Sequence, residues 1–281
     1  MEYLITGASG MLGQDMQAAL ANRSVTPLSR AELDVTDLAA VRSAVAGHDV
    51  IINCAAYTKV DDAETNEDAA YAVNATGAKN LALAAAAHGA VLVQVSTDYV
   101  FDGAATAPYP EGAALQPVSA YGRTKAAGER LALESNPGRT HIVRAAWLYG
   151  AHGPNFARTM LRLASEREEL SVVDDQVGQP TWTLDLARQI VALLDSKAPA
   201  GTYHATNSGQ ASWFQFARAI FSAAGLDPAR VKPTDSSSFV RPAPRPAYSV
   251  LGHDAWQRVG LAPMRPWDEA LAAASADGVL A

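Results

Sequence analysis

The sequence predicts an α/β fold in which helices cover both faces of a parallel sheet. In the first half, short apolar runs alternate with helical patterns, which is typical of βαβ units. Several of these runs are apolar at consecutive positions, as in strands that are buried on both faces. The chain has 281 residues, 49% of them hydrophobic, which is enough for one large domain or for a main domain with a smaller partner.

The expected elements follow from the period of the apolar residues. In the first half we predict strands at 3–6, 25–28, 50–53, 91–96 and 141–144, and helices at 11–21, 37–45, 67–88 and 120–135. Beyond Trp147 the alternation loosens. There we predict helices at 155–167 and 213–224, a strand at 170–173, a turn at 178–180, and a helix (183–194) and strand (201–205) that rejoin the main sheet. The proline-rich segment 240–248 is expected to be a loop.

A glycine-rich turn, Thr6-Gly7-Ala8-Ser9-Gly10-Met11-Leu12-Gly13, directly follows the first strand. Its first glycine permits a tight turn, its second lets the backbone approach a pyrophosphate, and its third allows close packing of helix on sheet. The helix N-terminus then offers free N–H groups and a partial positive charge. The turn predicts a Rossmann-type dinucleotide site whose binding residues include Gly7, Gly10, Met11, Leu12 and Gly13.

We therefore expect a doubly wound Rossmann-type sheet with a smaller, interleaved C-terminal part. Residues 1–147, joined by 181–207, would form the dinucleotide-binding domain. Residues 148–180 and 208–281 would form a smaller substrate-binding domain.

The end of the second strand distinguishes the two nicotinamide cofactors. An acidic residue there suits the ribose of NAD, whereas an arginine suits the 2′-phosphate of NADP. This sequence has Ser29-Arg30 at that point, so we expect NADPH, with NADH left open. Asp34, followed by Val35, is expected near the adenine amino group. Each polar residue here could instead belong to a solvated surface.

Small residues follow the strand 50–53, in the run Asn53-Cys54-Ala55-Ala56-Tyr57-Thr58. They would let a dinucleotide lie against the carboxyl edge of the sheet, where ligands of open α/β folds bind. Cys54 is interpreted as a small core residue, because no neighbouring His or Lys would lower its pKa. As the only cysteine, it excludes an intrachain disulfide and is compatible with the cytoplasm.

Tyr121 and Lys125 lie one turn apart on the predicted helix 120–135 and therefore share a face. The lysine ammonium is expected to lower the pKa of Tyr121 toward working pH. The phenol would then be a competent general acid for a ketone oxygen whose carbon receives hydride. A hydroxyl at the end of the strand 91–96, from Thr97 in preference to Ser96, could hydrogen-bond the same oxygen.

Together these motifs resemble the extended short-chain dehydrogenase/reductase family and, within it, the dTDP-4-dehydrorhamnose reductases. The wider resemblance rests on 6–13, Asn74, Gly77, Asn80, Thr97, Tyr121 and Lys125, and the narrower one on 53–61, 96–103, 147–150, 175–181 and 245–249. It implies that Thr97, Tyr121 and Lys125 are catalytic. It also implies that Ala55, Ala56, Tyr57 and Thr58 line the cofactor, and that Thr97, Asp98, Tyr99 and Trp147 contact the sugar nucleotide.

The resemblance implies reduction of the 4-keto group of dTDP-4-dehydro-6-deoxy-L-mannose to dTDP-L-rhamnose by NADPH. Two departures, Ala145-Ala146 before Trp147 and Lys59 after Thr58, leave the sugar contacts open. Arg245 could bind the substrate diphosphate or could equally be a packed or surface residue. The alternatives are a reductase or epimerase of another nucleotide sugar, and a non-catalytic regulatory subunit that binds a dinucleotide.

The net charge and the spacing of the histidines argue against a nucleic-acid-binding, membrane-binding or metal-dependent protein. A net charge of −7 disfavours nucleic acid and anionic membranes as partners. The six histidines have no metal-ligand spacing, so we expect no catalytic metal. The N-terminus has no signal-peptide pattern, which favours a cytoplasmic protein. We expect a monomer or a homodimer.

Overall fold

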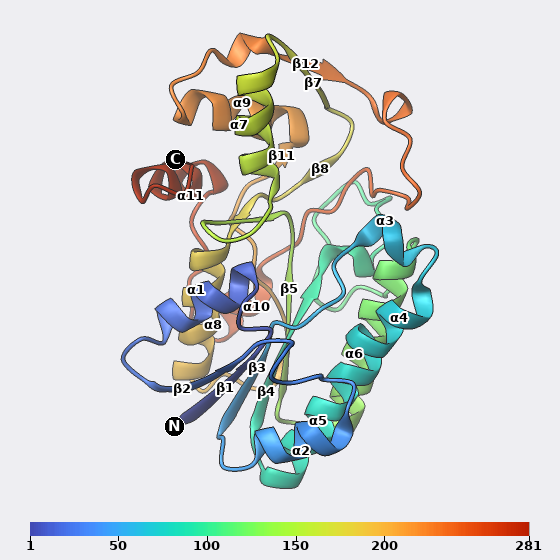
Figure 1. The fold of residues 1–281 in the computed structure, drawn as a ribbon, viewed down its shortest axis with the longest axis vertical. Helices are drawn as coiled ribbons and strands as arrows, with labels where there is room; N and C mark the ends of the chain where they lie inside the picture. Colours follow the sequence, from blue (N-terminus) through green and yellow to red (C-terminus); the bar gives the residue numbers. More distant parts are fainter. Residues whose placement is uncertain (281) are drawn as a thin grey trace.

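The computed structural model describes residues 1–280, and a six-stranded sheet forms its centre (Figure 1). The spatial order of its strands is β2-β1-β3-β4-β5-β10, and every neighbouring pair is parallel. The strands are β1 (Glu2–Thr6), β2 (Ser24–Leu28), β3 (Val50–Asn53), β4 (Val91–Thr97), β5 (Thr140–Ala145) and β10 (Gly201–His204). This confirms the predicted α/β class with a parallel sheet.

Helices cover both faces of this sheet (Figure 1). On one face lie α1 (Met11–Ala19), α8 (Thr183–Asp195) and α10 (Asp254–Arg258). On the other lie α2 (Leu38–Val45), α5 (Gly77–His88) and α6 (Ala120–Ser135). The short helices α3 (Val60–Ala63) and α4 (Glu67–Tyr71) precede α5.

Side chains that alternate along the strands divide the main core into two layers. Tyr3 and Ile5 of β1 pack with α1, α8 and Trp256 of α10, whereas Leu4 packs with α2 and α5. All three side chains are at most 1% exposed. The consecutive apolar residues of the sequence therefore reflect burial on both faces, as predicted.

A second core holds together the smaller part of the molecule, which lies beyond the carboxyl edge of the sheet (Figure 1). Its members include Met160, Phe216, Ile220 and Leu271, contributed by three helices. Those helices are α7 (Phe156–Glu166), α9 (Trp213–Ala223) and α11 (Trp267–Ala276). Three two-stranded sheets complete it: β6 (Leu148–Tyr149) with β9 (Thr181–Trp182), β7 (Leu170–Val173) with β12 (Val231–Thr234), and β8 (Val177–Gly178) with β11 (Ala211–Ser212).

The structure differs from the prediction in two respects. It divides the segment 67–88, and it contains α-helices and strands that were not predicted, namely α3, α10, α11, β6, β8, β9, β11 and β12. A single helix is expected over 67–88, but a π-helical stretch, Ala72–Thr76, separates α4 from α5. Apolar periodicity cannot reveal such a stretch, since it changes the backbone hydrogen bonding and not the residue type. The segment 240–248 is irregular, as expected.

Within residues 1–280, no helix is both long and apolar enough to cross a membrane. The same residues contain no group of three or more His, Cys, Asp or Glu side chains placed to hold a metal ion.

Candidate active site

The strand order reverses between β1 and β3, so the loops after these strands diverge at the carboxyl edge of the sheet. Ligands of open α/β sheets bind at this point. A cavity of about 1040 Å³ lies there. It is lined by most of the predicted site residues, namely Gly7, Gly10, Met11, Leu12, Gly13, Arg30, Asp34, Val35, Ala55, Ala56, Tyr57, Thr58, Thr97, Asp98, Tyr99, Tyr121, Lys125 and Trp147.

The glycine-rich turn forms one wall of this cavity, and two of its glycines have no room for a side chain. Gly7 has φ +67°, and a Cβ there would lie 2.6 Å from the backbone nitrogen of Ala55. A Cβ on Gly13 would lie 2.7 Å from the Cα of Ala8. The backbone of the turn is therefore the lining surface, as a pyrophosphate site requires.

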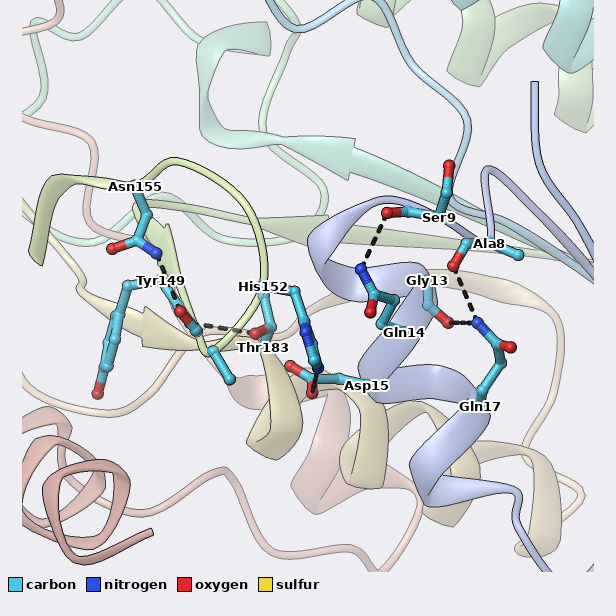
Figure 2. A network of polar contacts seen from close by, with 12 residues as sticks. Ala8, Ser9, Gly13, Gln14, Asp15, Gln17, Tyr149, His152, Asn155 and Thr183 are labelled. Carbon is cyan, nitrogen blue, oxygen red and sulfur yellow. Dashed lines mark hydrogen bonds and ion pairs between the residues drawn. The ribbon is translucent and has the colours of Figure 1, made fainter. Parts of the chain in front are cut away.

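Two glutamines of α1 fix the turn from the other side (Figure 2). The Nε2 of Gln14 donates to the carbonyl of Ser9 at 3.0 Å. The Nε2 of Gln17 donates to the carbonyls of Ala8 at 2.9 Å and of Gly13 at 3.0 Å. These hydrogen bonds tie three backbone carbonyls of the turn to side chains of α1. Neither glutamine was predicted as a site residue from the sequence.

The loop after β2 places Arg30 and Asp34 at the far end of the cavity, but not Ser29. The backbone N–H of Ser29 donates to Glu32 at 2.8 Å. Asp34 accepts hydrogen bonds from the backbone and the hydroxyl of Thr36, and these bonds lower its pKa. Arg30 is thus the cation among the lining residues at this end.

The loop after β3 is held by an asparagine of the π-helical stretch. Asn74 accepts from the backbone N–H of Tyr57 at 2.8 Å and donates to its carbonyl at 3.2 Å. The same side-chain amide donates to the hydroxyl of Thr124 on α6 at 3.0 Å. Asn74, part of the family resemblance, therefore joins the cofactor-facing loop to the helix that carries Tyr121.

Cys54 lines the cavity, and burial raises the pKa of its thiol to about 12. Contrary to the expectation that no Lys lies near it, the charge of Lys125 acts in the opposite direction, but burial outweighs it. A thiol with so high a pKa stays protonated and is a poor nucleophile. The structure therefore favours the interpretation of Cys54 as a small core residue.

Helix α6 places Tyr121 and Lys125 in the same cavity, where both side chains are buried. The Nζ of Lys125 donates to the carbonyl of Val95 on β4 at 2.6 Å, and burial lowers the pKa of Lys125 to about 8. Burial raises the pKa of Tyr121, although interaction with the Thr97 hydroxyl partly offsets this. The expected lowering of the Tyr121 pKa is therefore wrong for the free protein, because loss of solvation dominates and the Asp98 carboxylate raises the pKa further.

Thr97 ends β4 and faces the same cavity. Its hydroxyl donates to Asp98 at 2.9 Å, and burial raises the pKa of Asp98 to about 6. Tyr99 packs edge-on against Tyr121, with ring centroids 5.6 Å apart. The three residues 97–99 thus surround the phenol with hydrogen-bonding groups and one aromatic ring.

Two tryptophans close the cavity on the side of the smaller part. Trp147 has φ +48°, which is rare for a bulky residue, and its ring stacks on that of Trp213 at a centroid distance of 3.5 Å. A Cβ on Gly178 would lie 2.5 Å from the Trp147 ring. Trp213 was not predicted as a site residue, since nothing in its local sequence distinguishes it from a packed helix residue.

Arg245 is not among the cavity-lining residues. It forms an ion pair with Asp61 at 2.9 Å and donates to the carbonyl of Ala243 at 3.1 Å. Its charge is therefore already neutralised in this structure.

Comparison with known proteins identifies the family. The model of the RmlD substrate binding domain family matches residues 1–279. The chain belongs to this family. The RmlD-type chain is 53% identical to a dTDP-4-dehydrorhamnose reductase of Streptomyces griseus, over 96% of this chain and 91% of that protein. It is also 50% identical to a dTDP-4-keto-6-deoxy-D-glucose reductase of Streptomyces niveus, over 96% and 94%.

A solved structure extends the comparison to three dimensions. The crystal structure of a dTDP-4-dehydrorhamnose reductase of Bacillus anthracis in complex with NADP superposes on this RmlD-type chain with a TM-score of 0.95. The two are 42% identical, and the match covers 99% of this chain and all of that one. The two folds are therefore the same throughout their length.

Proposed function

We propose that this protein reduces the 4-keto group of dTDP-4-dehydro-β-L-rhamnose to dTDP-L-rhamnose, with NADPH as the reductant, in the cytoplasm. One observation carries the proposal. A single cavity joins the glycine-rich turn at one end to Thr97, Tyr121 and Trp147 at the other. The names of the relatives, two of them reductases of dTDP-linked keto sugars, support the same substrate class.

The residues present fit a dinucleotide. The glycine-rich turn and the N-terminus of α1 would hold its diphosphate, Arg30 its 2′-phosphate, and the loop 55–58 its nicotinamide end. The bound cofactor supplies the hydride that reduces the sugar carbonyl. Asp34 would face the adenine.

Tyr121 would donate a proton to the oxygen on C4 of the sugar. Its raised pKa keeps the phenol protonated at neutral pH, which is the form a general acid requires. Thr97 would orient the carbonyl through its hydroxyl. Lys125, with a pKa near 8, is mostly cationic at neutral pH and would stabilise the phenolate that remains after the transfer.

Trp147 would provide the apolar surface against which the 6-deoxyhexose lies, with Thr97, Asp98 and Tyr99 as hydrogen-bonding neighbours. The strained backbone of Trp147 and its stacking on Trp213 fix the ring before any ligand binds. Arg245 would reach a substrate diphosphate only by giving up its partner Asp61.

A second candidate function is the same reduction of a 4-keto group, but on a different dTDP-linked sugar. The relative at 50% identity is named for a D-gluco substrate, and the residues before Trp147 are two alanines, which give the sugar no polar contact from their side chains. Reduction of dTDP-4-keto-6-deoxy-D-glucose is therefore the alternative substrate assignment.

The test is a panel of dTDP-4-keto-6-deoxyhexoses assayed for oxidation of NADPH and of NADH. We expect the highest kcat/KM with dTDP-4-dehydro-β-L-rhamnose and NADPH. A higher value with the D-gluco substrate would select the second candidate. Interconversion of sugars by protein that retains NAD, without net consumption of cofactor, would overturn both in favour of an epimerase.

Arg30→Ala is expected to weaken NADPH binding by about 10- to 100-fold, because a hydrogen-bonded charge pair contributes about 1.5–3 kcal/mol. NADH, which lacks the 2′-phosphate, should bind within about threefold of its affinity for the unmodified protein. The Kd values of both cofactors, measured by fluorescence titration, check this. Arg42→Ala on the exposed surface of α2 is the matched control. Equal weakening of both cofactors would contradict the assignment.

A further inference from the structure

The segment 150–155 links β6 to α7 and lies opposite the N-terminal half of α1 (Figure 2). Its Gly153 and Pro154 line the same cavity as the glycine-rich turn. A Cβ on Gly150 would lie 3.4 Å from the side chain of Met11, the first residue of α1. The segment therefore borders the diphosphate end of the cavity.

Hydrogen bonds hold the residue before the segment and join the two ends of the segment to each other. The carbonyl of Tyr149 accepts from the Thr183 hydroxyl at 3.1 Å, and that of Gly150 accepts from the Asn155 amide at 2.9 Å (Figure 2). Gly153, with φ +70°, contributes a left-handed turn without the strain of a side chain. In the middle of the segment, the carbonyl of Ala151 accepts from Arg158 of α7 at 2.6 Å, whereas the side chain of His152 makes no hydrogen bond to any described residue.

A contact across the gap to α1 is made by the side chain of His152, and it is an ion pair when the imidazole is protonated. The Nε2 of His152 lies 3.9 Å from Oδ1 of Asp15 and points toward it (Figure 2). Among residues 1–280, no other hydrogen bond or ion pair joins the segment to α1. His152 is therefore the polar link between the two walls of the cavity.

The carboxylate of Asp15 is buried, and one of its oxygens has no hydrogen-bond partner within the part of the chain that the structure describes. Its side chain is only 9% exposed, and its Oδ2 is buried without a hydrogen bond from any described residue. Burying a carboxylate oxygen without a hydrogen bond costs free energy. His152, when its imidazole is protonated, would offset the charge of this carboxylate from the side of Oδ1.

We propose that Asp15 and His152 form a latch that holds the segment 150–155 as a flap across the diphosphate end of the cofactor site. The latch rests on the proposed function, since the flap acts on NADPH. Both residues are positioning residues. Closing the latch would slow the departure of the cofactor, and opening it would let the segment move on Gly150 and Gly153.

The test uses the full chain with NADPH and compares His152→Gln, Asp15→Asn and the double variant. Each single variant should raise koff of NADPH by about three- to tenfold with little change in kon, since a contact formed after encounter acts mainly on koff. The double variant should be no worse than the poorer single variant, because both remove the same contact. Stopped-flow fluorescence gives both rate constants.

A second measurement needs no cofactor. Hydrogen exchange of the amides in 150–155 should become faster in His152→Gln, whereas exchange in α7 should not change. Glu166→Gln, which breaks the exposed pair with Arg162 on α7, is the matched control and should leave koff unchanged. His152 is 40% exposed, so its substitution tests the latch even if Asp15→Asn folds poorly.

Three outcomes would count against the latch. A koff within twofold of the unmodified value in His152→Gln would overturn it, and so would effects of the two substitutions that multiply in the double variant. Both leave the proposed function intact, because the unmodified protein still binds NADPH. Failure of the unmodified protein to bind NADPH would overturn the latch and the proposed function together.

Discussion

Tyr121→Phe is expected to lower kcat by about 10²- to 10⁴-fold, the usual contribution of a positioned general acid. The substitution removes one oxygen from a buried ring and keeps the packing against Tyr99. NADPH should therefore bind within about threefold of its normal affinity, because the phenol is proposed to act on the sugar oxygen. Steady-state kinetics and a cofactor titration on the same preparation check both parts.

Tyr71→Phe is the matched control, since Tyr71 is 42% exposed and does not line the cavity. It should leave kcat unchanged. A Tyr121→Phe variant that keeps more than about a tenth of the normal turnover would remove Tyr121 from its assigned role. An equal loss of NADPH affinity would instead indicate a role in cofactor binding.

Gly13→Ala is expected to weaken NADPH binding by about 100-fold or more, because backbone N–H bonds to a charged phosphate contribute about 1.5–3 kcal/mol each. The added methyl would collide with the carbonyl of Gly7 and would lie 2.7 Å from the Cα of Ala8. Backbone atoms cannot move aside as a side chain can, so α1 and the glycine-rich turn must separate. We also expect the free energy of unfolding to fall by about 1–3 kcal/mol.

Calorimetric titration with NADPH and denaturant unfolding measure the two effects. Gly112→Ala is the control, because its added methyl meets no atom within 4 Å and its backbone does not have a positive φ. It should change neither quantity. Normal cofactor affinity in Gly13→Ala would contradict the placement of the diphosphate at this turn.

Several features of the site were not predictable from local patterns. Asn74 lies 17 residues from the loop it holds, and its reach depends on a π-helical stretch that apolar periodicity does not report. Trp213 reaches the cavity only because α9 packs against the strained Trp147. The Tyr121 pKa was predicted in the wrong direction, because spacing shows a nearby ammonium but does not show how completely the phenol is buried.

The sequence by itself determined the six strands of the main sheet and most of the helices that cover it, the glycine-rich turn, and the spacing of Tyr121 and Lys125. These features follow from short-range periodicity and backbone sterics. Only the tertiary structure decided which side chains meet across the cavity. In the folded chain Arg245 pairs with Asp61, Ser29 lies outside the cavity lining, and His152 lies near Asp15. Such contacts depend on how separate elements pack, and residue spacing along the chain carries no record of that packing.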